Sequence, residues 1–135
     1  MDHRVFRSLD HIAIAVPDTE EALKHWRDRV GLKVLYSEVV NQGSVRLTHL
    51  DLGNTHLQLV EPLTPNHPIR AWLVQNGPGL HHLCMKVDSA HEAFEQLPGL
   101  NLPTGPAMHQ GTQGKHAFFL EPKATQGVRV EVTGP

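Results

Sequence analysis

A stretch near the start of the chain returns in altered form in the second half. The run Leu-Asp-His-Ile-Ala-Ile-Ala-Val, which begins at Leu9, aligns with Leu-His-His-Leu-Cys-Met-Lys-Val, which begins at Leu80. The alignment has an offset of 71 residues and places His82 on His11. An internal repeat of this length constrains the fold strongly, because it predicts two similar units that share one core.

A second alignment links the ends of the two halves. The run Thr-His-Leu-Gln-Leu-Val-Glu-Pro from Thr55 resembles Val-Arg-Val-Glu-Val-Thr-Gly-Pro from Val128, with an offset of 73 residues. This alignment places Glu131 on Gln58. The repeat therefore singles out four candidate residues, which are His11, Gln58, His82 and Glu131.

The length of the chain sets the number of domains. With 135 residues it is long enough for one compact domain with a hydrophobic core, and too short for two independent ones. We therefore expect one domain made of two halves, about residues 8–62 and 79–134. The content of 39% hydrophobic and 19% charged residues, with a formal net charge of -2, is that of an ordinary soluble protein.

Charge and hydropathy argue against nucleic-acid and membrane partners. The 12 Lys and Arg residues are scattered and form no basic stripe, and no apolar run approaches the roughly 18 residues of a membrane span. The first residues lack the pattern of a signal peptide. The single cysteine, Cys84, excludes an intramolecular disulfide and fits a reducing compartment, so a cytoplasmic protein is expected.

The first copy of the repeat begins with a strand. Residues 9–16 alternate between an apolar face, made by Ile12, Ile14 and Val16, and a smaller, more polar face that carries His11. One face of this strand should therefore contribute to a core, while the other remains available for function.

A helix should follow this strand. Pro17-Asp18-Thr19 ends the strand and provides a cap, and Gly31 is a typical residue for the end of a helix. The expected apolar face of the helix consists of Ala22, Leu23, Trp26 and Val30.

The remaining chain continues the same order of elements. Further strands are expected at residues 33–40, 45–52, 55–61, 80–87, 115–120 and 127–132, a poor strand at 103–110, and helices at 69–76 and 89–97. In the last strand, Val128, Val130 and Val132 should form the apolar face. Both halves thus read β-α-β-β-β, which predicts an α+β fold of two repeated units forming a curled mixed sheet.

The four candidates should lie on strands, on the face away from the helices. Two imidazoles, a carboxylate and an amide oxygen suit a divalent metal ion such as cobalt, manganese, nickel or zinc, with coordination positions left for water or substrate. In a chain with 11 histidines, a single strand histidine is more often a surface or core residue than a ligand. The pairing of His with His and Gln with Glu within the repeat favours the metal site. His81 should point to the helix side and is excluded, whereas Cys84 shares the face of His82 and should serve mainly for packing.

Seven short motifs are distributed along the chain: Leu-Asp-His-Ile-Ala-Ile-Ala-Val-Pro-Asp from Leu9, Leu-Gly-Asn-Thr from Leu52, Val-Glu-Pro-Leu from Val60, His-Pro-Ile from His67, Gly-Leu-His-His from Gly79, Phe-Leu-Glu-Pro-Lys from Phe119 and Gly-Val-Arg-Val-Glu from Gly127. With these motifs the chain resembles the vicinal oxygen chelate superfamily and, within it, the methylmalonyl-CoA epimerase family. The resemblance covers nearly the whole chain. It implies a glyoxalase-like fold of paired β-α-β-β-β units around a metal ion, usually in a homodimer.

The resemblance also implies a ligand set and a reaction. The family's metal ligands fall on His11, Gln58, His82 and Glu131, and the related glyoxalase I has Glu where this chain has Gln58. An isomerase of this family would interconvert (R)- and (S)-methylmalonyl-CoA by removing the C2 proton, with the resulting enolate stabilised by the metal. Glu131 would then act both as a ligand and as the catalytic base.

One departure from the family pattern keeps alternatives open. Many epimerases have a second glutamate in the strand after a Gln-Gly turn, whereas the strand after Gln42-Gly43 has no acid and presents Arg46 or Leu47 there. A lactoylglutathione lyase of the glyoxalase I type, or another enzyme of the superfamily, is the first alternative. A non-catalytic protein that binds a small ligand is the second, although the complete ligand set argues against it.

Overall fold

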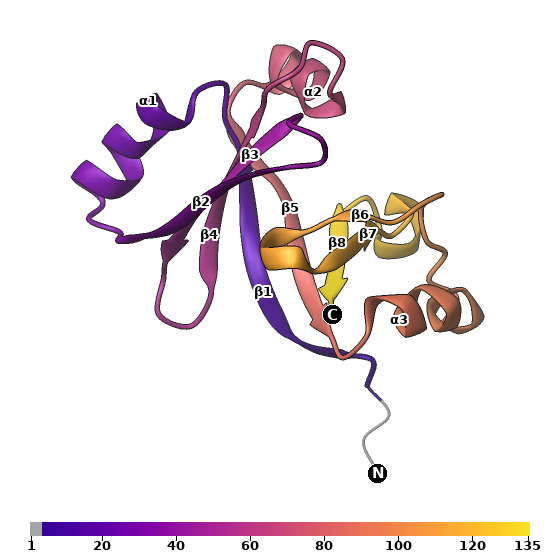
Figure 1. Ribbon diagram of the computed structural model, residues 1–135. Coiled ribbons are helices and arrows are strands. Elements are labelled where there is room, and N and C mark those ends of the chain that lie inside the picture. Colours follow the sequence, from indigo (N-terminus) through magenta and orange to yellow (C-terminus); the bar gives the residue numbers. More distant parts are fainter. Residues whose placement is uncertain (1–3) are drawn as a thin grey trace. The chain divides into compact units, whose positions relative to one another are not determined.

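The computed structural model describes residues 4–135, and Figure 1 shows the order of its elements. The strands are β1 (Phe6–Ala15), β2 (Val34–Val40), β3 (Val45–Asp51), β4 (His56–Pro62), β5 (Gly79–Val87), β6 (His109–Gln110), β7 (His116–Phe119) and β8 (Val130–Gly134). The α-helices are α1 (Thr19–Leu23), α2 (Pro68–Asn76) and α3 (Ala90–Gln96). A π-helix at Lys24–Arg29 and short 3-10 helices at Leu97–Leu100, Thr112–Gly114 and Pro122–Thr125 complete the set. The predicted β-α-β-β-β order is confirmed in both halves.

The chain forms two compact units. The first unit contains residues 11–81, and the second contains residues 82–135 together with the chain up to Asp10. Strand β1 therefore begins in the second unit and ends in the first. Its early part is held in the second unit because Val5 and Phe6 pack against that unit's apolar core, and because Arg7 forms an ion pair of 3.0 Å with Asp88.

In the first unit the strand order is β2-β3-β4-β1, and apolar residues cover both faces of this sheet. Strands β1 and β4 are parallel, whereas the β2–β3 and β3–β4 pairs are antiparallel. One apolar cluster joins the sheet to α1 and includes Ile14, Val16, Leu57, Leu59, Ala22 and Leu23. The other joins it to α2 and includes Ala13, Ala15, Val60, Ile69 and Leu73. Ala13 and Val60 lie on the face that carries Gln58, so the expectation that the candidates lie on the face away from the helices is wrong for α2 in this unit.

The first helix begins where the sequence predicts it, but its second part is a π-helix and not the expected α-helix. Asp18 caps it as expected, because its side chain accepts a hydrogen bond of 3.1 Å from the Glu21 amide. From Lys24 onward the backbone widens to a π-helix, in which the Val30 amide donates to the His25 carbonyl at 2.8 Å. The wider turn shifts later residues around the helix axis. Val30 is consequently 57% exposed rather than part of the apolar face.

In the second unit the order is β5-β8-β7-β6, with β5 and β8 parallel. Helix α3 packs against β7 and β8 (Figure 1), and Ser89 caps α3 by accepting a hydrogen bond from the Glu92 amide at 3.2 Å. The poor strand expected at residues 103–110 is reduced to His109–Gln110.

The last strand also differs from its prediction at its first residues. It begins at Val130, and Val128 is 50% exposed, so only Val130 and Val132 contribute to the apolar core. The preceding turn explains the shift, because Gln126 and Gly127 have left-handed backbone angles, with φ of 56° and 88°. A chain in this conformation cannot continue a strand.

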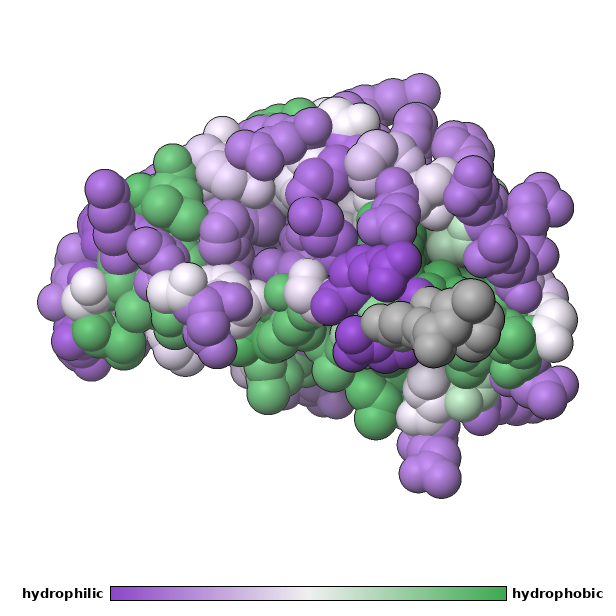
Figure 2. Space-filling model, turned by 90° about the horizontal axis from the view of Figure 1, so that it is seen from below, coloured by the Kyte–Doolittle hydropathy of each residue, from purple (hydrophilic) through white to green (hydrophobic). Residues whose placement is uncertain are grey.

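The surface mixes polar and apolar residues. On the face shown in Figure 2, hydrophilic residues surround several hydrophobic groups, which appear green. The large hydrophobic residues with the highest exposure are Val74 at 82% and Leu80 at 70%. Within residues 4–135, none of the helices has the length and apolar character needed to span a membrane.

Candidate functional site

In the first unit, His11 and Gln58 project from the same face of two neighbouring strands. Strand β1 pairs with β4 so that His11 lies opposite His56 and Ala13 lies opposite Gln58. Residues two apart on a strand share a face, so the two candidate ligands are on the same side. Both are buried, with His11 only 2% and Gln58 only 3% exposed.

In the second unit, His82 and Glu131 are arranged in the same way on β5 and β8. Cys84 lies opposite Glu131, and His82 is two residues before Cys84 on the same face. The His82 Nε2 atom is 3.2 Å from the Glu131 Oε1 atom, and both side chains are almost completely buried.

The two units therefore repeat one geometry. The Ala13–Gln58 pair of the first unit corresponds to the Cys84–Glu131 pair of the second, with the sequence offsets of 71 and 73 residues. In each unit a histidine precedes the paired residue by two positions on the adjacent parallel strand. The sequence alignment of the two halves thus corresponds to equivalent strand pairings.

Glu131 has a second partner that the sequence analysis did not single out. The His109 Nε2 atom lies 2.7 Å from the other carboxylate oxygen, Oε2, and the His109 ring stacks on Phe119 with 5.4 Å between ring centres. His109 falls in the segment expected to be a poor strand, so no alternation pattern drew attention to it.

Gln58 has a partner of a different kind, which the sequence analysis also missed. Its amide Nε2 atom lies 3.0 Å from Nε2 of His49, and Nδ1 of His49 lies 2.9 Å from Nδ1 of His56. The register of β3 against β4 places His49 directly opposite Gln58. This pairing was missed because the sequence analysis predicted the two strands without assigning the register between them.

Arg46 and Leu47, the two residues that the resemblance places where a second glutamate is expected, lie on opposite faces of β3. Leu47 shares the face of His49 and is buried in the cluster that includes Ala13 and Val60. Arg46 is on the opposite face, where it donates a hydrogen bond of 2.9 Å to the Ser37 hydroxyl. On the face of Gln58, β3 thus presents the aliphatic Leu47, and the acid of this strand, Asp51, lies at its exposed end.

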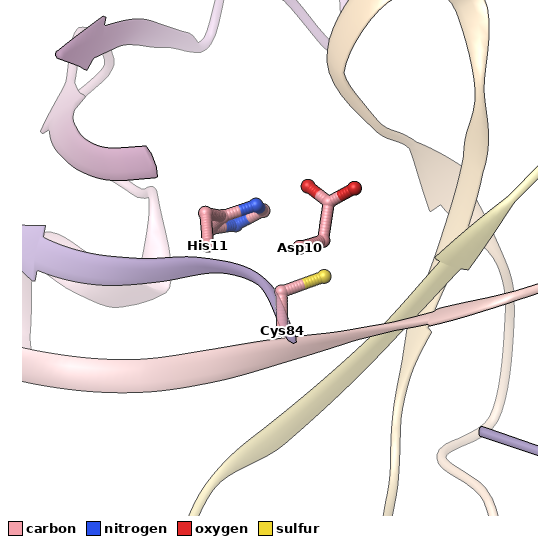
Figure 3. A group of neighbouring side chains, drawn as sticks. All are labelled: Asp10, His11 and Cys84. Carbon is pink, nitrogen blue, oxygen red and sulfur yellow. The ribbon is translucent and has the colours of Figure 1, made fainter. Parts of the chain in front are cut away.

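Cys84 is enclosed by polar neighbours within the second unit. Figure 3 shows it beside Asp10, together with His11, the next residue along β1, and the Asp10 and Cys84 ligand atoms lie within 4.8 Å of each other. The Asp10 carboxylate in turn lies 3.5 Å from the Lys115 ammonium group. Burial, and after it the negative charges of Glu131 and Asp10, raises the pKa of the Cys84 thiol far above its usual range.

We expect the Cys84 thiol to be unreactive in the folded protein. Thiolate is the nucleophilic form, and both the raised pKa and the complete burial suppress it. Native protein treated with a disulfide reagent at pH 8 should show almost no modification, and unfolded protein should be modified at once. Rapid modification of the native protein would mean that Cys84 is accessible.

His81, the neighbour of His82, lies against helix α2. Its ring contacts that of Trp72 on α2 in an edge-on arrangement, with 5.0 Å between ring centres. Trp72 itself packs against the apolar cluster of the first unit. His81 thus lies against α2, whereas His82 lies beside Glu131, and the exclusion of His81 from the candidate ligands stays a prediction.

The donors available in each unit fit a divalent transition-metal ion. Each unit provides one imidazole nitrogen and one oxygen donor, an amide in the first and a carboxylate in the second, on adjacent parallel strands. Burying such polar groups costs free energy that a bound cation can offset.

Known proteins are similar to this chain in sequence and in fold. Residues 10–119 match the model of the Glyoxalase/Bleomycin resistance protein/Dioxygenase superfamily. The mitochondrial methylmalonyl-CoA epimerase of Mus musculus is 38% identical over 128 residues, which are 92% of this chain and 71% of that protein.

Two solved structures are similar to the chain throughout. The methylmalonyl-CoA epimerase of Mycobacterium tuberculosis superimposes with a TM-score of 0.89 at 25% identity, covering 100% of this chain and 92% of that one. A methylmalonyl-CoA epimerase in complex with methylmalonyl-CoA and NH4+ has a TM-score of 0.85 at 27% identity, covering 96% of this chain and 94% of that one. The expected α+β, glyoxalase-like fold is confirmed by these matches.

Proposed function

Because the chain belongs to the Glyoxalase/Bleomycin resistance protein/Dioxygenase superfamily, we propose that it is an isomerase that interconverts (R)- and (S)-methylmalonyl-CoA. The observation that carries this proposal is the repeated strand pairing that presents Gln58 in one unit and Glu131 in the other. Relatives named methylmalonyl-CoA epimerase, similar over nearly the whole chain, support the same activity.

We propose that His11, Gln58, His82 and Glu131 together bind one divalent ion, such as cobalt, manganese, nickel or zinc. Support comes from their equivalence in the repeat, from their burial, and from the donor types, which suit these ions. The halves at about residues 8–62 and 79–134 would then act as one domain. When bound, the ion would supply an electrophile for the thioester and carboxylate oxygens of an acyl-CoA substrate.

Glu131 is the proposed base that takes the proton from C2. Its carboxylate is buried, and His109 holds one of its oxygens by a contact of 2.7 Å, which restricts the orientation of the group. A fixed orientation favours proton transfer, because a base must lie within hydrogen-bonding reach of the proton that it removes. Residues Leu47 and Ala13 provide an apolar surface on the face of Gln58, which would limit the access of bulk water.

Exchange of the C2 hydrogen tests the proposed function. Methylmalonyl-CoA is incubated in deuterated water with the protein, with and without added cobalt, and deuterium at C2 is measured by mass spectrometry. We expect exchange that depends on the protein and increases with cobalt. Absence of exchange, combined with turnover of the hemithioacetal of methylglyoxal and glutathione, would instead establish a glyoxalase-type lyase.

We also propose a cytoplasmic homodimer. The exposed side chains of Val74 and Leu80 in the first unit offer apolar surface for a second copy, and the thiol of Cys84 fits a reducing compartment. Trp26 and Trp72 are partly buried and pack against the apolar clusters of the first unit. Light scattering at micromolar concentration should give twice the mass of 15.0 kDa, and a monomer would refute the dimer without affecting the site.

A further inference from the structure

The two oxygen donors of the repeat face chemically different partners. In the first unit β3 places His49 opposite Gln58, and in the second unit β7 places Phe119 opposite Glu131. His49 and Phe119 are therefore equivalent positions of the repeated unit. One can accept a hydrogen bond and the other cannot.

This difference matches the chemistry of the two donors. A carboxylate presents only acceptors, so it needs no acceptor beside it. In an amide, one oxygen and one NH2 group are bonded to the same carbon at nearly equal distances, and only the oxygen is a good metal ligand. An amide ligand must therefore be held with its nitrogen turned away from the ion.

His49 is placed to hold the amide in that orientation. The Gln58 Nε2 atom lies 3.0 Å from the Nε2 atom of His49, so the amide donates and the ring nitrogen accepts. The acceptor nitrogen must carry no proton, which leaves Nδ1 of His49 protonated and able to donate to Nδ1 of His56, 2.9 Å away. The chain of hydrogen bonds then runs in one direction, from Gln58 to His49 to His56.

The surroundings of His49 restrict its ring. It is 1% exposed and stacks on Tyr36 with 4.7 Å between ring centres and an angle of 15° between planes. The ring of His11 lies edge-on to it at 5.3 Å. A ring confined in this way presents the same nitrogen to Gln58 and cannot easily rotate to offer the other.

We propose that His49 is a positioning residue that orients the Gln58 amide, so that the amide oxygen and not its nitrogen is presented to the metal ion. The inference rests on the proposed role of Gln58 as a ligand. His49 itself contacts neither the ion nor the substrate in this scheme. It acts through Gln58, as an outer partner that fixes the direction of a ligand.

The tautomer of His49 can be measured without any substitution. Nitrogen NMR of the histidine rings in the metal-free protein should show a proton on Nδ1 and none on Nε2 of His49. The same tautomer should persist after Co²⁺ is added. A proton on Nε2 would reverse the hydrogen bond, present the amide oxygen to His49, and overturn the inference.

The affinity for Co²⁺ tests whether the orientation of the Gln58 amide by His49 strengthens metal binding. Titration calorimetry of His49→Phe, which copies the equivalent residue Phe119 and removes the acceptor, should give a Kd about 10- to 100-fold weaker than that of the unaltered protein. His49→Gln provides another acceptor and should recover most of the affinity. His25→Phe, a change of the same type at an exposed residue, should leave the Kd unchanged.

A second pair of proteins, both carrying Gln58→Glu, distinguishes an orienting role of His49 from a role in packing alone. In Gln58→Glu the ligand has two equivalent oxygens, so adding His49→Phe should change the Co²⁺ affinity by less than about threefold. An equal loss in both backgrounds would show that His49 only supports the structure and would overturn the inference. Co²⁺ binding with no C2 exchange would overturn the proposed reaction alone, and a protein that binds no Co²⁺ would overturn the metal site together with the role of His49.

Discussion

Glu131→Gln is expected to reduce exchange of the C2 hydrogen by about 10²- to 10⁴-fold, the usual contribution of a general base. The amide that replaces the carboxylate retains an oxygen that can bind metal, but it cannot accept a proton at neutral pH. Metal content should therefore decrease much less than activity. Deuterium incorporation at C2 and metal analysis of the same preparation measure both quantities.

A control variant at an exposed glutamate tests whether the loss of exchange is specific to Glu131. Glu121→Gln, the same change at an exposed residue of the second unit, should retain full exchange. The contact of Glu131 with His109 should weaken in Glu131→Gln, because a charge-assisted hydrogen bond becomes a neutral one. If Glu131→Gln retained near-normal exchange, another group would carry the proton, even if Glu131 remained a ligand.

His11→Ala and His82→Ala should each remove the metal ion. Each change deletes one imidazole from the proposed set of four donors, and alanine provides no donor in its place. Metal analysis after dialysis should find about one ion per chain in the unaltered protein and little in either variant. Undiminished occupancy in both variants would contradict the ligand assignment.

The melting temperature provides an independent measure of the same site. A ligand at a hundredfold excess over its Kd stabilises the folded state by about 2.7 kcal/mol. Added metal should therefore raise the melting temperature of the unaltered protein and of His25→Ala, a matched change at an exposed histidine. It should have little effect on His11→Ala or His82→Ala, which keeps loss of binding distinct from loss of folding.

The repeat by itself determined the order of elements and the strand positions of the four proposed ligands. Alignment of the two halves places His82 on His11 and Glu131 on Gln58, and the structure pairs the corresponding strands in the same way in each unit. Such a prediction succeeds because strand side chains alternate with a period of two, so a sequence alignment also aligns the faces. The binding of metal by these residues stays a prediction.

Local backbone geometry decided where the predicted apolar faces end. The π-helix turns Val30 into solvent, and the left-handed residues before β8 leave Val128 outside the strand. The apolar pattern thus extends one residue past the end of the π-helix, and it starts two residues before β8. The sequence pattern assigns a hydrophobic side chain to the apolar face of a helix or strand. The hydrogen bonding of the backbone determines whether that helix or strand includes the residue.

Only the tertiary structure revealed the partners of the proposed ligands. His49 reaches Gln58 through the register of β3 against β4, and His109 reaches Glu131 from a two-residue strand with no alternation to mark it. The faces of Arg46 and Leu47 also became clear only from the pairing of β3, which places Leu47, and not Arg46, on the face of Gln58. These contacts depend on the register between strands and on side-chain directions within a few ångströms, and the order of residues along the chain specifies neither until the strands have paired.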